Sequence, residues 1–197
     1  MQWIITSETI DLKYFKHIIS YMRYIALLRG INAGGNRKVE MKKLRDLFEF
    51  LKYFNVSTYL NTGNVIFESD KKHEIIRKEI KTNLKKEFGF EILSLIKTET
   101  EVKKIAGVIP KHWQNDSSQR TDVAFLFPEI DSKKTLEELP VRKEFIDIRY
   151  IKGAIYWNID RKNYNKSHLN KIISHRSYQF MTLRNINTVR FLAGNKK

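Results

Sequence analysis

The amino-acid sequence predicts an α+β fold of two packed βαββαβ subdomains joined by a linking helix. Short apolar runs, typical of strands, alternate with amphipathic stretches that repeat every three to four residues, which is typical of helices. This order of elements runs through the first half of the chain and recurs in the second. The chain has 197 residues, 42% of them hydrophobic, so it can bury a core, which excludes an intrinsically disordered protein.

The first subdomain, residues 22–97, has the element order of a ferredoxin-like unit. It opens with the apolar run MRYIALL, and a loop that contains three glycines follows at 29–38. In chain order we expect a strand at 22–28, a helix at 40–53, strands at 56–60 and 64–69, a helix from Asp70, which can cap it, to Gly89, and a strand at 90–96.

Both faces of this predicted sheet are apolar. Tyr24, Ala26 and Leu28 point one way, and Ile25 and Leu27 point the other way. Such a sheet has to be covered on both sides, here by its own helices and by the linking helix or the second subdomain. We therefore exclude an RNA-recognition motif, which needs one bare sheet face.

A linking helix at 99–108 and a polar loop form a linker over residues 98–120, before the second subdomain at 121–197. In that subdomain we expect a strand at 122–127, a short helix at 132–139, a hairpin of strands at 145–151 and 154–159, a helix at 167–174, a strand at 178–183 and a closing helix at 185–193. Residues 1–21 form an N-terminal extension with a short amphipathic helix from about Glu8 to Tyr21. We expect Met22 to be the natural start of the protein.

The composition is strongly basic and lacks cysteine, with a net charge of +15. The absence of cysteine excludes a disulfide scaffold, a thiolate zinc site and a cysteine nucleophile, and fits a reducing cytoplasm. No apolar run approaches the roughly 18 residues of a membrane span, and no signal peptide is visible. We therefore expect a soluble cytoplasmic protein with no membrane partner.

The last part of the sequence carries positive charge and no acid. Such a segment attracts polyanions, although it also fits a surface that merely keeps the protein soluble. From Arg161 onward the nine basic residues are Arg161, Lys162, Lys166, Lys171, Arg176, Arg184, Arg190, Lys196 and Lys197.

The predicted topology brings two polar segments together. In a βαββαβ sheet the loop after the first strand and the turn between the second and third strands emerge at the same end. Glycines there free backbone N–H groups, and the following helix N-terminus adds partial positive charge, which suits a phosphate or a carboxylate. The candidate ligand-binding residues in these segments are Arg29, Asn32, Gly34, Gly35, Arg37, Asn61, Gly63 and Asn64.

Turn chemistry is the alternative explanation for these residues, because glycines permit tight turns and asparagines cap them. The spacing from Gly30 to Gly35 matches a phosphate-binding P-loop. However, Asn36 and Arg37 replace the required Lys-Ser/Thr pair, which excludes a nucleoside triphosphatase.

A third polar segment, Arg184-Asn185-Ile186-Asn187-Thr188, precedes the closing helix. Asn185 is a good N-cap, but capping explains only one of its asparagines. If the subdomains dock so that Arg184 faces the glycine loop, three arginines converge on one pocket. We therefore add Arg184, Asn185 and Asn187 to the candidate ligand-binding residues.

These segments carry a family resemblance. Over most of residues 22–192 the chain resembles the Domain of Unknown Function 1697 family. The segments that resemble the family signatures are LLRGINAGGNRKVEMKKLRDLF (27–48), STYLNTGNVIF (57–67) and RNINTV (184–189). The resemblance implies a two-subdomain α/β protein and brings no established activity, substrate or catalytic residues. Ile186 stands where Trp is common in the family pattern. The motif residues are Arg29, Gly30, Asn32, Gly34, Gly35, Gly63, Asn64, Arg184, Asn185, Asn187 and Thr188.

Catalytic signals are weak. The five histidines are scattered without metal-ligand spacing, Asp122 and Asp160 are isolated carboxylates, and no Gly-x-Ser-x-Gly motif occurs. We therefore assign no metal, no cofactor and no catalytic residue, and leave open whether the protein is an enzyme.

Three functional hypotheses remain. The first is binding of a phosphate-bearing ligand, with nucleic acid slightly favoured over a small molecule. The second is a small-molecule enzyme or ligand binder that uses a pocket of Arg29, Asn32 and Asn64. The third is a protein-interaction module in which the polar loops pack the subdomains together and bind nothing. The sequence does not determine the oligomeric state.

Overall fold

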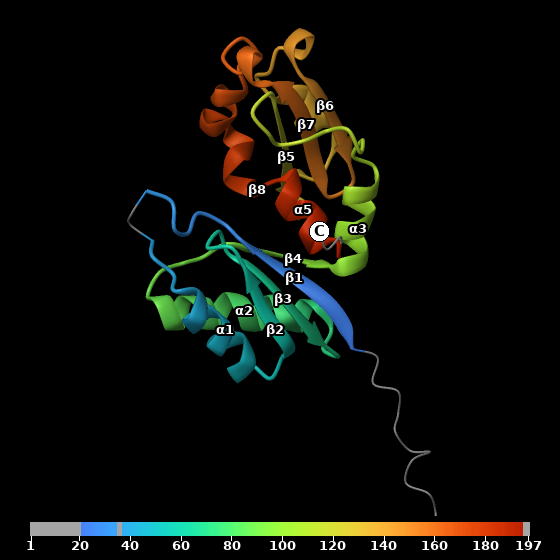
Figure 1. Ribbon diagram of the computed structural model, residues 1–197. Coiled ribbons are helices and arrows are strands. Elements are labelled where there is room, and N and C mark those ends of the chain that lie inside the picture. Colours follow the sequence, from blue (N-terminus) through green and yellow to red (C-terminus); the bar gives the residue numbers. More distant parts are fainter. Residues whose placement is uncertain (1–20, 35–36, 195–197) are drawn as a thin grey trace, which may run out of the picture.

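The computed structural model describes residues 21–34 and 37–194 as an α+β structure with two four-stranded antiparallel sheets (Figure 1). The N-terminal extension, except for Tyr21, lies outside the described residues, and so does the helix expected there. Gly35, Asn36 and residues 195–197 lie outside them as well. None of the helices in the two described ranges is long and apolar enough to cross a membrane.

The first sheet contains β1 (Met22–Leu28), β2 (Phe54–Tyr59), β3 (Asn64–Ser69) and β4 (Ser94–Thr98), in the spatial order β2-β3-β1-β4. Helices α1 (Met41–Phe50) and α2 (His73–Phe88) cover one face of it. The predicted bounds of β1 and β3 are confirmed. The faces of β1 separate as expected, because Tyr24 and Ala26 pack with these helices while Ile25 and Leu27 belong to a different cluster.

The second sheet contains β5 (Gln119–Leu126), β6 (Asp147–Ile151), β7 (Ala154–Asp160) and β8 (Met181–Asn185), in the order β6-β7-β5-β8. Its outer face packs against helix α4 (Lys133–Glu138) and against short 3-10 helices. The 3-10 helices that contribute to this packing are η1 (Pro128–Ile130), η4 (Leu169–Ser174) and η5 (Arg176–Phe180). The described residues of this half also form the 3-10 helices η2 (Lys143–Phe145) and η3 (Arg161–Asn163).

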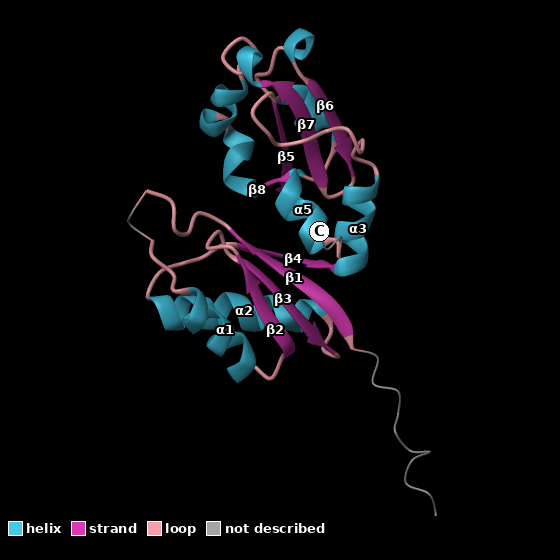
Figure 2. Ribbon diagram, viewed as in Figure 1, coloured by secondary structure: helices cyan, strands magenta, loops and turns pink. Residues whose placement is uncertain are grey.

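A layer of two helices lies between the two sheets (Figures 1 and 2). It consists of α3 (Glu99–Gly107), the predicted linking helix, and α5 (Ile186–Leu192), the predicted closing helix. The prediction that the first sheet is covered on both faces is therefore confirmed. The central core contains Ile25, Leu27, Ile66 and Leu95 from the first sheet, Val102 and Ile105 from α3, Val123, Phe125 and Tyr156 from the second sheet, and Ile186, Val189 and Leu192 from α5.

Local side-chain chemistry sets several helix ends. Thr98 and Glu101 form a reciprocal capping box at the start of α3. Gly89, with φ of +75°, ends α2 as predicted. The prediction that Asp70 caps α2 is wrong, because the N-cap is Lys72, whose side chain makes no capping hydrogen bond.

Two predicted elements of the second half and one of the first are shifted or changed in type. The strand expected at 90–96 is β4 at 94–98, because residues 90–93 cross from α2 to the sheet. The helix expected at 167–174 is the 3-10 helix η4. Ser167 Oγ accepts from Leu169 N and donates to Tyr164 O, which competes with α-helical pairing. Because η5 occupies 176–180, the strand expected at 178–183 is β8 at 181–185.

Candidate functional site

The loop after β1 and the β2–β3 turn lie side by side, as the topology predicted. Leu28 N donates to Gly63 O over 2.8 Å, which closes the turn against the end of β1. The Asn32 side chain donates to Asn61 O over 2.8 Å and to Val39 O over 2.9 Å, and its Oδ1 accepts from Val39 N. Asn32 therefore closes the loop on itself and ties it to the turn.

Gly63 is required by this close approach. Its φ is +77°, and a Cβ atom there would lie 2.7 Å from both Leu28 Cβ and Ile31 Cδ1. By contrast, a Cβ on Gly34, with φ of +71°, would meet nothing within 4 Å. Gly63 thus has a packing role, whereas Gly34 needs glycine only for its backbone conformation.

The docking of the halves brings the Arg184 guanidinium from β8 onto the β2–β3 turn. Its Nη2 donates to Leu28 O over 2.8 Å, to Thr62 O over 3.0 Å and to Gly63 O over 3.2 Å. Nη1 donates to Thr182 Oγ1 and to Leu183 O, and Nε donates to Asn64 Oδ1.

Six protein acceptors therefore surround the five N–H groups of Arg184, and none of them is a carboxylate. The side chain is 7% exposed, and burial lowers the pKa of Arg184 to about 10. It still carries a full charge at neutral pH, which oriented carbonyl dipoles stabilise in place of a counter-ion. No N–H group of Arg184 remains for a ligand in this arrangement.

Asn64 joins the same network from the first half. The residue is fully buried, and its Nδ2 donates to Tyr59 O over 2.8 Å and to Thr62 Oγ1 over 3.0 Å. Because its Oδ1 accepts from Arg184, all polar atoms of the Asn64 side chain are engaged within the protein.

Arg29 makes the reciprocal connection, from the first half to the second. Its Nε donates to Met181 O over 2.8 Å and its Nη2 to Tyr178 O over 3.0 Å. The guanidinium also lies 5.0 Å from the centre of the Tyr178 ring, within the range of a cation–π contact. Arg29 and Arg184 thus cross the seam between the halves in opposite directions.

Comparison with known proteins agrees with the resemblance. The model of the family described as "Protein of unknown function (DUF1697)" matches residues 22–157, which is more than half of the chain. The chain belongs to this family. It is also similar to a solved structure, a conserved bacterial protein, SP0830, from Streptococcus pneumoniae, with 25% identity and a TM-score of 0.78 over 90% of this chain and 100% of that chain. No curated protein matches the chain.

The other candidate ligand-binding residues differ in how far a ligand can reach them. Asn185 Oδ1 accepts from Thr188 N over 2.9 Å and caps α5, as predicted. Gly34, Asn61 and Asn187 are exposed. Arg37 is exposed too, with its guanidinium 5.9 Å from the centre of the Phe90 ring. The candidate residues therefore include both buried residues that connect the halves and residues that face solvent.

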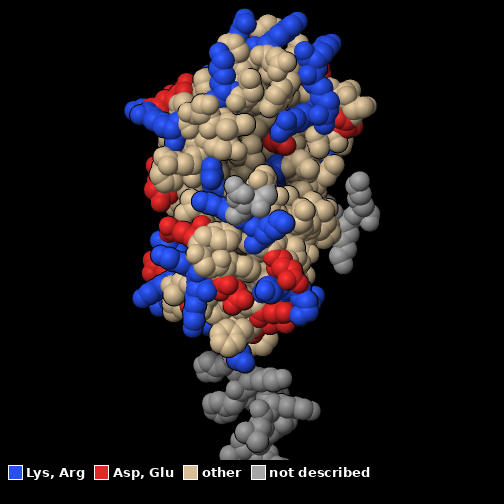
Figure 3. Space-filling view, turned by 90° about the vertical axis from the view of Figure 1, so that its left-hand side faces the viewer, with Lys and Arg blue, Asp and Glu red and all other residues tan. Residues whose placement is uncertain are grey.

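The face of this DUF1697 protein that carries the loop is rich in basic side chains. Figure 3 shows Lys and Arg side chains across the middle and the upper part of the view, and more acidic side chains in the lower part than in the upper part. No acid occurs between Arg29 and Val39. Lys166 and Lys171 are exposed and make no ion pair within the described residues.

Several arginines and lysines of the acid-free C-terminal segment have structural partners. Arg190 donates to the carbonyls of Pro110, Lys111 and Trp113. Arg161 donates to Asp116 O over 2.6 Å. Arg176 pairs with Glu138 over 2.8 Å, and Lys162 pairs with Asp160 over 3.5 Å. The segment is therefore only partly available to a polyanion.

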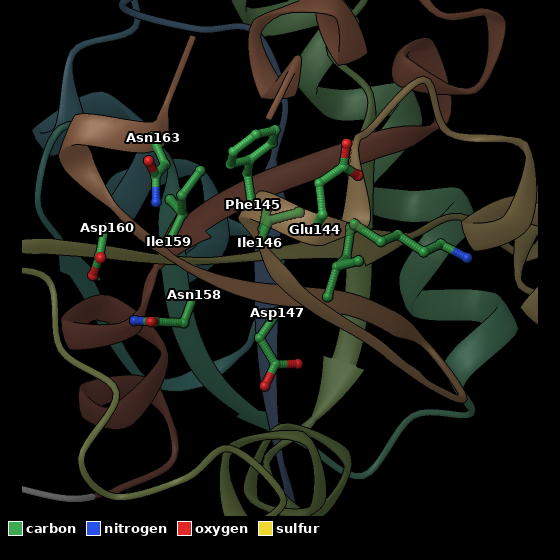
Figure 4. A pocket seen from close by; sticks show the side chains of 10 residues that line it. Glu144, Phe145, Ile146, Asp147, Asn158, Ile159, Asp160 and Asn163 are labelled. Carbon is green, nitrogen blue, oxygen red and sulfur yellow. The ribbon is translucent and has the colours of Figure 1, made fainter. Parts of the chain in front are cut away.

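A cavity of about 540 Å³ opens away from the DUF1697 motifs, where η2 and β6 meet the end of β7 (Figure 4). Two of its polar residues have partners in the protein. Asp147 pairs with Arg149 over 2.6 Å, and Asn158 donates to Thr121 Oγ1 over 2.8 Å. In the described part of the chain, no cluster of three or more His, Asp or Glu residues could hold a metal ion.

The structure supplies a partner for Asp122, which the sequence left isolated. Arg120 Nε donates to Asp122 Oδ2 over 2.5 Å. Burial nevertheless raises the pKa of the Asp122 carboxyl, and Arg120 offsets this effect only in part. Trp157 lies opposite Asp122 across the β5–β7 ladder, and its indole Nε1 is buried with no hydrogen-bond partner among the described residues.

Proposed function

We propose that this DUF1697 protein binds a phosphate-bearing ligand, with nucleic acid as the favoured class, on the face that the loop at 29–38 shares with η4 and η5. One observation carries the proposal. The hydrogen bonds of Arg29 to Tyr178 and Met181 fix the acid-free loop against the acid-free segment that begins at Arg161. Two basic stretches far apart in the sequence thus adjoin on one surface.

The exposed cations on this surface supply the attraction. Arg37 and Lys38 extend from the loop, and Lys171 lies in η4. A field of one sign raises the rate at which a polyanion approaches, and each phosphate neutralised releases counterions. The same chemistry serves a phosphate-bearing small molecule, but an extended ligand reaches more of these separated charges.

Under this proposal Arg29 and Arg184 position the surface and do not contact the ligand. Their guanidinium N–H groups bond to backbone carbonyls on the opposite half. The ligand then contacts Arg37, Asn61 and the backbone around Gly34, all of which are exposed. We place this activity in the cytoplasm.

We also propose that the two halves are a duplicated ferredoxin-like unit. Both sheets have equivalent strand orders, β2-β3-β1-β4 and β6-β7-β5-β8, with the first strand of each half inside the sheet and the second at an edge. The second half departs from the unit because 3-10 helices replace its second α-helix. Ferredoxin-like domains host many functions, so the fold does not select among them.

The test is fluorescence polarisation with labelled RNA and DNA, single-stranded and duplex, across a series of salt concentrations. If about six phosphates are neutralised, log affinity should fall with log salt at a slope near −5. The variant Arg37→Ala/Lys38→Ala should weaken binding and reduce the steepness of the slope by about 2. No affinity for any of these nucleic acids at low salt would contradict the proposal.

The matched control removes the same charge elsewhere. Lys104 on α3 and Lys152 in the β6–β7 turn are both exposed, and Lys104→Ala/Lys152→Ala should leave the slope and the affinity unchanged. An equal loss in both double variants would show attraction to the net charge of the protein and not to this face.

A second candidate is a module in which the polar loops join the halves and bind nothing. The engagement of every Arg184 N–H group within the protein favours it. No comparable observation favours a small-molecule pocket of Arg29, Asn32 and Asn64, because their side chains donate to protein acceptors.

A further inference from the structure

Two aromatic rings stack on each other at the edge of the seam. Tyr59, at the end of edge strand β2, lies parallel to Phe191 of α5, with ring centroids 3.7 Å apart and an interplanar angle of 13°. Phe191 is 38% exposed, and the neighbouring Leu60, with φ of +56°, is 52% exposed. The pair therefore presents an apolar, aromatic surface to solvent.

Two amide side chains lie close in sequence to this pair. Asn187 is exposed one turn before Phe191 on α5, which places the two on the same helix face. The exposed Asn61 follows Leu60 in the β2–β3 turn, and its carbonyl accepts from Asn32 of the glycine-containing loop. No acid occurs from Val56 to Phe67 or from Arg161 to Gly194. The aromatic surface thus continues into the basic face described above.

We propose that the stacked Tyr59–Phe191 pair is a platform on which a base of a single-stranded nucleic acid stacks, an inference that rests on the proposed function and narrows its ligand. Aromatic rings accept any base because every base has a π face. Asn61 and Asn187 offer amide donors and acceptors to base edges. The basic loop attracts the phosphates of the same strand. The occupant that fits this surface is therefore a polyanion.

The Tyr59–Phe191 pair should favour a single-stranded nucleic acid over a duplex. In a duplex the base faces are already stacked within the helix, whereas an unpaired base can lie on a protein ring. The flat face of the first sheet cannot serve as such a platform, because α3 and α5 cover it. The pair lies instead at the edge strand, where β2 is partly exposed along its length.

The alternative is that the pair only seals the seam between β2 and α5. Phe191→Leu separates the two roles, because leucine keeps apolar packing and removes the ring. Phe191→Tyr keeps the ring and serves as the conservative control. Thermal unfolding of both variants reports any loss of packing. If the pair only seals the seam, Phe191→Leu should change thermal unfolding and leave nucleic-acid binding unchanged.

The experiment compares two labelled strands of about 12 nucleotides, one with bases and 2-aminopurine at its centre and one abasic. Wild type should bind the base-containing strand about tenfold more tightly and quench the 2-aminopurine emission. Phe191→Leu should lose both the preference and the quenching, and Phe191→Tyr should keep them.

The possible failures are distinguishable. If wild type binds both strands equally without quenching, or if Phe191→Leu keeps the preference, the platform is wrong while the proposed function stands. If wild type binds duplex but neither single strand at low salt, the platform is wrong. If it binds no nucleic acid at low salt, single-stranded or duplex, the proposed function itself is wrong. The quenching measurement needs only the wild-type protein, so a variant that fails to fold does not prevent the test.

Discussion

Arg184 Nη2 lies 2.8 Å from the carbonyl oxygen of Leu28, and this hydrogen bond joins β8 of one half to the end of β1 in the other. Arg29, the residue after Leu28, reaches back to Met181 at the start of β8. Leu28, the last residue of β1, and Arg29, which follows it, thus bond to Arg184 and Met181 of the same strand, β8. These two arginines therefore connect the halves at the end of β1.

Arg184→Met should lower the free energy of unfolding by about 3–5 kcal/mol, as measured by urea denaturation. The substitution leaves buried carbonyl acceptors without donors, and such losses are among the largest for a single polar side chain. Arg184→Lys should recover only part of the loss, since an ammonium group cannot reach acceptors in a planar fork. A change below about 0.5 kcal/mol for Arg184→Met would contradict this role.

Arg29→Ala should be less damaging, with a loss of about 1.5–3 kcal/mol in the same assay, because its two hydrogen bonds are only half-buried. Arg37→Ala is the natural control, since Arg37 is exposed in the same loop and should change stability by less than about 0.5 kcal/mol. Equal effects of the two substitutions would show that the contacts of Arg29 with Tyr178 and Met181 contribute little.

Gly63→Ala should destabilise the protein by about 2–5 kcal/mol, since it combines a left-handed backbone with a steric clash against Leu28 and Ile31. Gly89→Ala has almost the same φ, +75°, and no neighbour within 4 Å, so it should lose only about 1–2 kcal/mol. Thermal or urea unfolding of the pair isolates the clash. Similar losses for both would mean that the turn relaxes away from β1.

The free energy of unfolding of Asp122→Asn should increase relative to that of wild type as the pH rises above about 3.8, the ordinary pKa of the aspartate carboxyl. Burial raises the pKa of Asp122, so the native state holds its proton more tightly than the unfolded state does. Between the pKa of Asp122 in the unfolded state and its higher pKa in the native state, the free energy of unfolding of wild type therefore falls with rising pH. The Asp122→Asn variant has no such dependence at this position. Urea unfolding of both proteins from about pH 3 to about pH 7 measures the difference. A difference that changes in the opposite direction would contradict the effect of burial.

Local patterns predicted much of the fold. Strands β1 and β3 follow from their apolar runs, and the Asn185 cap and the Gly89 helix end follow from side-chain chemistry within a few residues. The 3-10 helix η4 did not follow, because Ser167 redirects hydrogen bonds inside a sequence that otherwise has a helical pattern.

For the candidate site, the sequence predicted only those contacts that follow from the order of the strands in one sheet. The meeting of Asn32 and Asn61 follows from strand order, whereas the contact of Arg184 with Leu28 joins residues 156 apart and depends on how the halves dock. Neither strand periodicity nor loop composition carries that information. The Tyr59–Phe191 pair was missed for the same reason, since each residue alone has the pattern of an ordinary packing side chain.

The helix layer between the sheets has a consequence for biosynthesis. Residues 186–192 follow all eight strands in the sequence, yet they cover Ile25, Leu27, Ile66 and Leu95 of the first sheet. A nascent chain that has left the ribosome only through β4 therefore exposes that inner face to water, a state prone to aggregation. We therefore expect this face of the first half to stay exposed until α5 emerges from the ribosome.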